Sequence, residues 1–228
     1  PAAPRPPRDA RAPRRRRTRS PGQRLAWLAA MAVALAPGAY LAWQLWLAWT
    51  GQPHALGEEP VERLEHETGE LAIRFLVGTL LVTPVRALTG WNALAPYRRT
   101  LGLLAFGYVT VHLLVFAALD LELQLGEVAS EIVERPYITV GFVAWLLLVP
   151  LALTSTAGWI RRLGGARWRA LHRLTYAVSV LAIVHYWWSQ KKDVTEPAIY
   201  AAVVALLLGW RLWQARRRAG ARPEPAAG

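Results

Sequence analysis

The sequence predicts an all-α integral membrane protein, a bundle of six transmembrane helices with both chain termini in the cytoplasm. Hydrophobic residues make up 54% of its 228 residues, and they come in long blocks rather than alternating with polar residues as in a soluble domain. The formal net charge is +12, but the basic residues lie in tails and short loops, without the aromatic-interleaved basic domain of a nucleic-acid binder. The patterning therefore favours a membrane protein and disfavours nucleic-acid binding.

The absent motifs narrow the chemistry further. The sequence has no cysteine, which excludes thiolate-ligated haem, cysteine-ligated iron–sulfur clusters, cysteine zinc sites and disulfides. It also has neither a G-x-G-x-x-G nor a G-x-x-x-x-G-K motif, so we expect no dinucleotide-binding domain in these residues. A metal held here must use histidine, carboxylate or a neutral donor.

The elements follow from composition along the chain. Residues 1–24 are rich in Pro and Arg and predict a disordered basic cytoplasmic arm. Residues 25–49 exceed the apolar core of a signal peptide, about 7–15 residues, so we interpret them as a first transmembrane helix, with a kink at Pro37-Gly38. Five more apolar blocks can cross, or nearly cross, a hydrocarbon core of about 30 Å: 71–88, 100–119, 137–158, 171–189 and 195–213. The predicted transmembrane domain is thus 25–213, with 214–228 as a cytoplasmic tail.

The charges alternate in step with these six spans. Basic residues cluster in 1–24, 86–99, 161–173 and from Arg211 onward, whereas acidic residues cluster in 58–70, 120–134 and 193–196. Because cytoplasmic loops carry an excess of Arg and Lys, both termini are predicted to be cytoplasmic.

Two histidines, His112 and His185, fall inside apolar blocks, where an ionisable side chain is costly and usually functional. Counted from the cytoplasmic side, His112 lies about 18 Å along the third span and His185 about 20 Å along the fifth, at about 1.5 Å per residue. Two imidazoles at similar depth toward the outer face suit bis-histidine ligation of a haem iron. Hydrogen bonding between helices, or a proton relay, explains the pair equally well.

The other histidines are less informative. His172 lies at the inner end of the fifth span, about 140° around an ideal helix from His185, and Arg98 and Arg99 occupy the matching level of the third span. A second haem at that level would lack a visible axial partner. His54 is interpreted as a solvated residue of the first outer loop, and His66, in the same loop, as either a helix cap or a residue that faces a cofactor.

Arginines form an inner basic rim at the predicted cytoplasmic ends of the spans. The rim comprises Arg98, Arg99, Arg161, Arg162, Arg167, Arg169 and Arg173. Positive-inside sorting explains it, and its guanidinium groups would also suit haem propionates or a flavin phosphate.

Seven segments occur in an order and spacing that resemble a known family. They are His66-Glu67-Thr68-Gly69, Arg98-Arg99-Thr100-Leu101-Gly102-Leu103, Val111-His112-Leu113, Arg135-Pro136-Tyr137, Thr154-Ser155-Thr156, Arg167-Trp168-Arg169-Ala170-Leu171-His172-Arg173-Leu174-Thr175-Tyr176 and His185-Tyr186-Trp187-Trp188. Together they resemble the haem-binding membrane subunit of the bacterial periplasmic methionine-sulfoxide reductase system, the MsrQ/YedZ family of the ferric-reductase-like transmembrane superfamily. The resemblance covers roughly residues 25–213.

The resemblance implies a ferric-reductase-like bundle in the bacterial inner membrane that binds haem b, with FMN as a further cofactor. His112, His172 and His185 match the family's ligand histidines, and His66 is a further candidate for cofactor binding. Electrons would come from the quinone pool or a cytosolic flavin reductase. They would pass to a periplasmic molybdopterin subunit that reduces methionine sulfoxide in oxidised proteins. The chain would then be an electron-transfer subunit rather than the catalytic one.

Two features and two other functions stay open. The acidic outer loops either help to dock the periplasmic partner or simply complete the charge asymmetry. Tyr186, Trp187 and Trp188 either pack near the outer haem or form an interfacial aromatic belt. The chain could instead be another quinol-linked or ferric-reducing cytochrome b, or a small transporter with histidine proton relays.

Overall fold

The computed structural model describes residues 20–190 and 192–220. Every regular element in these residues is helical, as the sequence predicts. Residues 1–19, 191 and 221–228 lie outside the described residues, and with them most of the predicted basic arm and the end of the tail. The chain divides into two units, residues 1–40 and 41–228.

The described part of the first unit belongs to α1 (Pro21–Trp49), which starts within the predicted arm and passes through Pro37 as one helix. The last turns of α1 belong to the second unit. There the buried Gln44 accepts a hydrogen bond of 2.7 Å from the main-chain N–H of Ala55. This bond ties the end of α1 to the loop that follows it.

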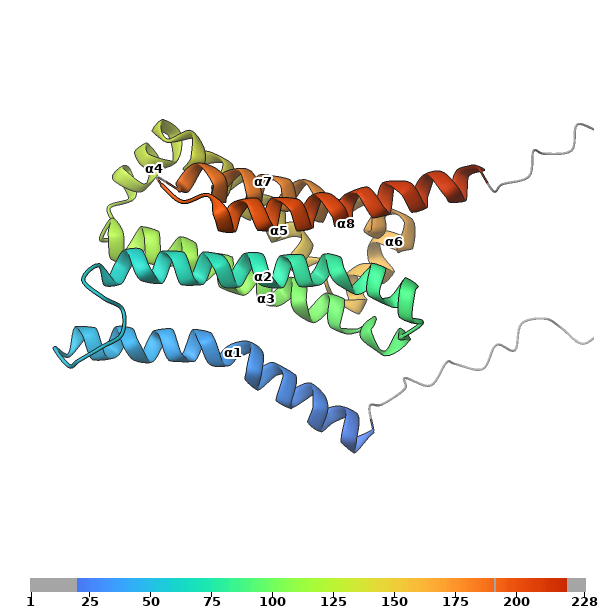
Figure 1. Ribbon diagram of the computed structural model, residues 1–228, viewed down its shortest axis with the longest axis horizontal. Helices are drawn as coiled ribbons and strands as arrows, with labels where there is room; N and C mark the ends of the chain where they lie inside the picture. Colours follow the sequence, from blue (N-terminus) through green and yellow to red (C-terminus); the bar gives the residue numbers. More distant parts are fainter. Residues whose placement is uncertain (1–19, 191, 221–228) are drawn as a thin grey trace, which may run out of the picture. The chain divides into compact units, whose positions relative to one another are not determined.

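The second unit is a bundle of α2 (Pro60–Thr89), α3 (Tyr97–Val115), α5 (Pro136–Leu153), α7 (Leu174–Ser189) and α8 (Thr195–Gly220), which run alongside one another (Figure 1). The main pairs are α2 with α3 and α5 with α7. Contacts of α3 with α5, and of α8 with α2 and α7, join the pairs. The bundle is thus built from two helix pairs, each contributing one of the two intramembrane histidines.

Shorter elements occupy the ends of this bundle. A 3₁₀ turn (Asn92–Leu94) precedes α3, and a π-helical turn (Phe116–Asp120) ends it. Figure 1 shows α4 (Leu125–Glu134) at one end of the bundle and α6 (Ala157–Leu171) at the other. The acidic segments gather at the α4 end and most basic loop residues at the α6 end, which reproduces the charge alternation in three dimensions.

The second helix starts earlier than its apolar block. The structure begins α2 at Pro60, where proline suits the first helical position, and buries Leu64 and Thr68 on the face that continues to Leu71. Residues 60–70 are rich in charged residues that favour helices, and the buried face stabilises the helix through them by packing. His66 therefore lies in α2, and its predicted place in an outer loop is wrong.

The fifth predicted span is interrupted. His172 caps the C-terminus of α6 and Arg173 precedes α7, so residues 171–189 are not one helix. The angle of about 140° between His172 and His185, which assumes an ideal helix, therefore does not apply.

Among the described residues, five helices are long and apolar enough to cross a membrane: α1, α2, α3 with its π turn, α5 and α8. This identifies a multi-pass membrane protein. Helix α7, with 16 residues, would span about 24 Å at about 1.5 Å per residue. The sixth span and the cytoplasmic termini stay predictions.

Candidate functional site

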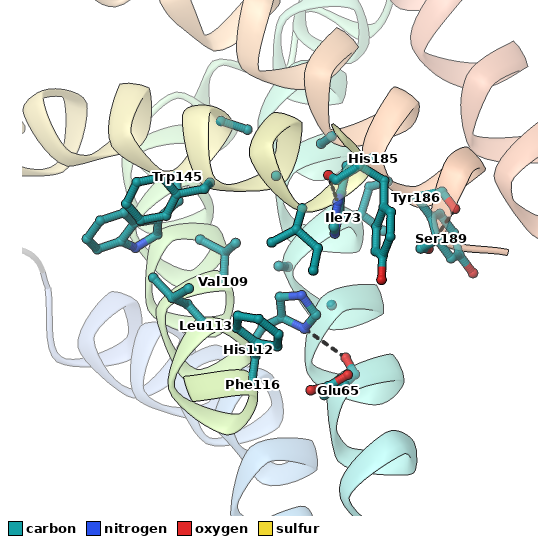
Figure 2. Close-up of a pocket in the computed structure, with 18 of the residues that line it drawn as sticks. Glu65, Ile73, Val109, His112, Leu113, Phe116, Trp145, His185, Tyr186 and Ser189 are labelled. Atoms are coloured by element: carbon teal, nitrogen blue, oxygen red, sulfur yellow. Dashed lines mark hydrogen bonds between the residues drawn. The ribbon is translucent and has the colours of Figure 1, made fainter. Parts of the chain in front are cut away.

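The structure brings His112 of α3 and His185 of α7 together across a cavity of about 300 Å³ (Figure 2). Their ring centroids lie 6.1 Å apart, with the ring planes at 74° to one another. The two residues are far apart in sequence, and the packing of the α2–α3 pair against the α5–α7 pair makes them neighbours. The cavity volume lies within the range of about 300–1,000 Å³ typical of cofactor and ligand sites.

Both rings are held by the same kind of bond. His112 Nδ1 lies 2.9 Å from the main-chain oxygen of Glu65, and His185 Nδ1 lies 2.7 Å from the main-chain oxygen of Tyr137. Since a carbonyl only accepts, Nδ1 carries the proton in both rings. In the part of the chain that the structure describes, neither ring hydrogen-bonds through Nε2. A metal-ligating histidine shows this arrangement, with one nitrogen donating to a carbonyl and the other left to the metal.

These residues fit a haem iron with two axial imidazoles. Two metal–nitrogen bonds of about 2 Å each, plus the half-width of each ring, place the centroids of opposed imidazoles about 6 Å apart. The observed 6.1 Å agrees with that separation. Haem iron accepts histidine as axial ligand, and bundle cores are common places for such cofactors.

The cavity wall is mostly apolar. Figure 2 shows Ile73, Val109, Leu113, Phe116 and Trp145 around the two imidazoles. Such a wall suits a porphyrin face and keeps water from the metal, which controls redox potential.

Part of the cavity lining is polar and predominantly acidic. Its lining includes Glu65, His66, Glu70, Asp120, Glu131 and Arg135. His66 is exposed to solvent but reaches the lining, so the structure keeps it as a candidate contact rather than a ligand.

The three aromatic residues after His185 separate into two groups. Tyr186 lines the cavity, and its hydroxyl donates to Glu196 at 2.8 Å. Trp187 and Trp188 are 40% and 56% exposed and do not line the cavity. Their exposure favours the interfacial belt for these two tryptophans.

A second cavity, of about 550 Å³, is lined in part by Trp168 and Arg169 of α6. After the predicted membrane orientation, we call it the inner cavity and the cavity of His112 and His185 the outer cavity. Its lining includes four arginines of the predicted basic rim, Arg98, Arg99, Arg169 and Arg173, but not Arg161, Arg162 or Arg167. Planar guanidinium groups bind phosphate and carboxylate with paired hydrogen bonds. The four arginines make this inner cavity suitable for an anionic group.

His172 lines the inner cavity and does not join the other two histidines. Its Nε2 lies 3.1 Å from the hydroxyl of Thr154, and its ring stacks on Trp168 with centroids 4.0 Å apart. The Trp168 indole in turn donates to the main-chain oxygen of Thr154 at 2.9 Å. No second histidine is among the residues that line this cavity, so a bis-histidine arrangement fits only the outer cavity.

The remaining histidine, His54, lies in the loop after α1, where its Nδ1 accepts a bond of 3.3 Å from the Leu56 N–H. It lines neither cavity. The sequence did not reveal the carbonyl partners of His112 and His185, because main-chain groups leave no residue-type signal.

The fold and site define a multi-pass helical membrane protein with a histidine-lined cofactor cavity. Residues 68–183 match the family described as ferric reductase like transmembrane component. No solved structure matches the chain.

The chain is also similar to curated proteins named protein-methionine-sulfoxide reductase heme-binding subunit MsrQ. That of Xanthomonas euvesicatoria pv. vesicatoria is 52% identical over 197 residues, 85% of this chain and 90% of that protein. That of Xanthomonas campestris pv. campestris (strain 8004) is 52% identical over 200 residues, 86% of this chain and 91% of that protein. The Caulobacter vibrioides protein is 42% identical over 174 residues, 76% of this chain and 83% of that protein. The chain therefore belongs to the MsrQ family of haem-binding subunits within the ferric-reductase-like transmembrane proteins.

Proposed function

We propose that this chain is a transmembrane electron carrier that holds one b-type haem between His112 and His185. The observation that carries the proposal is the matched pair of imidazoles, each donating Nδ1–H to a main-chain carbonyl, with centroids 6.1 Å apart. A haem bound there supplies a one-electron redox centre within the bundle.

Residues of the chain orient the two histidines, exclude water and provide a place for an anionic group. The carbonyls of Glu65 and Tyr137 fix the tautomer and orientation of the two rings and raise their basicity. Apolar residues such as Leu113 and Phe116 exclude water from the site. The four inner arginines would hold an anionic group such as a flavin phosphate or a propionate. This cavity is our proposed place for FMN, with His172 as a candidate ligand should a second haem bind.

Similarity to proteins named as methionine-sulfoxide reductase subunits supports a direction for electron flow. We propose entry near the inner cavity, from the quinone pool or a cytosolic flavin reductase, and exit at the acidic outer end. The acceptor would be a periplasmic molybdopterin subunit that reduces methionine sulfoxide. The inner membrane of a bacterium is the corresponding location.

The first test is optical. The full chain, purified in detergent from haem-replete cells, should show a Soret band that shifts on reduction with dithionite. His112→Ala and His185→Ala should each lose the low-spin spectrum, whereas His54→Ala should keep it. A colourless wild-type protein would rule out the proposal and favour a transporter.

The second test separates this function from other cytochromes b. The reduced chain is mixed with the purified periplasmic reductase, with and without methionine sulfoxide. Reoxidation that requires both components supports the proposal. A reduced haem that is not reoxidised when the reductase and methionine sulfoxide are both added would identify a different cytochrome b.

A further inference from the structure

Each imidazole of the outer cavity rests against a glycine of the neighbouring helix. A Cβ built on Gly69 of α2 would lie 3.4 Å from His112 Nδ1. A Cβ built on Gly141 of α5 would lie 2.7, 2.8 and 3.0 Å from His185 Nδ1, Cε1 and Cγ. Neither glycine has a positive φ, so space for the ring, and not backbone conformation, is what an alanine would take away there.

The two glycines occupy the same place relative to the carbonyls that bind the rings. Gly69 follows Glu65 by one helical turn, and Gly141 follows Tyr137 by one helical turn. In each helix, the carbonyl that accepts the histidine Nδ1–H is therefore also the i−4 acceptor of the glycine N–H. Because neither glycine has a Cβ, each ring can lie close to the helix surface beside the carbonyl that it binds.

We infer that the carbonyls of Glu65 and Tyr137, each beside a glycine, form two matched seats for the rings of His112 and His185. At the tighter seat, Gly141 is required to position His185 with Nε2 directed at the cofactor. The inference rests on the proposed haem ligation and deepens it. It assigns a positioning role to Gly141, a residue that carries no functional group. It also explains why the two helix pairs, α2 with α3 and α5 with α7, present their histidines in the same way.

The two glycine positions differ in how well they tolerate an added methyl group. At Gly69 an added methyl group makes ordinary van der Waals contact with the ring. At Gly141 the methyl overlaps the ring, and the ring cannot withdraw easily. Tyr137 holds it through the 2.7 Å bond, and the phenol of Tyr137 is stacked on it with centroids 6.2 Å apart.

The experiment compares alanine substitutions in the full chain. Gly69→Ala should keep the haem content and the low-spin bis-histidine signature in electron paramagnetic resonance. Gly141→Ala should lose that signature or convert to a five-coordinate high-spin spectrum. The matched control is Gly107→Ala in α3, where a Cβ would meet nothing within 4 Å. It should match wild type.

A second variant guards against simple misfolding. If Gly141→Ala does not accumulate, the double variant Gly141→Ala/His185→Ala should accumulate to the level of His185→Ala, because the three atoms nearest the added methyl all belong to His185. Failure of that double variant would overturn the inference, since something other than the ring would then exclude alanine. An unchanged resonance spectrum and midpoint potential in Gly141→Ala would overturn it too. A wild-type chain without haem would instead refute the proposed function.

Discussion

Arg211, on α8, donates a hydrogen bond of 2.7 Å from Nη2 to the main-chain oxygen of Leu80, on α2. Leu80 is fully buried, and it stands four residues before Pro84 in the same helix. Proline has no N–H, so it cannot donate to the carbonyl one turn earlier. Arg211 therefore supplies the donor that Pro84 lacks, as an unpaired carbonyl in a membrane helix requires.

Removing this donor should destabilise the bundle. We expect Arg211→Met to lower the free energy of unfolding by about 1–2 kcal/mol, between the values for charged hydrogen bonds in soluble proteins and for hydrogen bonds within membranes. Thermal or denaturant unfolding in detergent measures the change. The control is Arg217→Met. The Arg217 guanidinium lies 4.1 Å from the ring centroid of Trp213 in an exposed part of α8, so its loss should lower the free energy of unfolding only slightly.

A double-mutant cycle isolates the cause. Pro84→Ala restores a main-chain N–H that can donate to the Leu80 carbonyl. Arg211→Met should therefore lower the free energy of unfolding less in that background than in wild type. Equal costs in both backgrounds would show that Arg211 acts through something other than the Leu80 carbonyl.

A second polar link joins α3 to α5 at the cavity wall. The Trp145 indole donates to the Thr110 hydroxyl at 3.1 Å, and that hydroxyl donates to the Phe106 carbonyl at 2.7 Å. Thr110→Val should leave the indole N–H without this acceptor and cost about 1 kcal/mol of unfolding free energy. Thr110→Ser should keep most of it. In a Trp145→Phe background, Thr110→Val should cost nearly nothing, and a full cost there would contradict the assignment.

The sequence predicted much of this fold because membrane helices carry their own signal. Long apolar blocks and alternating charge depend only on local composition, and they located the starts of α3, α5 and α8 to within a few residues. The start of α2 could not be predicted this way, since its first turns are charged and the burial of Leu64 and Thr68 that supports them depends on the tertiary structure.

The site, too, could be predicted from the sequence only in part. His112 and His185 could be singled out because ionisable residues are rare in apolar spans, and equal depth suggested that they meet. The carbonyls of Glu65 and Tyr137 were not predictable, because main-chain acceptors are independent of residue type. The break at His172 was also not predictable, because it depends on how α6 folds back before α7.

The separation of His172 from the other histidines leads to a third prediction. Because it lines the inner cavity and its Nε2 lies 3.1 Å from the Thr154 hydroxyl, His172→Ala should retain the bis-histidine spectrum of the outer haem. It should affect only a cofactor in the inner cavity, measured as haem and flavin per chain. Loss of the outer spectrum in His172→Ala, at wild-type helix content, would contradict this division.

The last prediction is that α7 crosses the membrane although it is short. Its 16 residues are short for a span, but the basic residues from Arg211 onward belong to the same charge class as those of α6, which favours a cytoplasmic C-terminus. Green fluorescent protein fused after residue 228 should fluoresce, and alkaline phosphatase fused there should be inactive. Alkaline phosphatase inserted after Gly126, at the acidic end, should be active. The opposite result at the C-terminus, with an active fusion at Gly126, would mean that α7 does not cross the membrane.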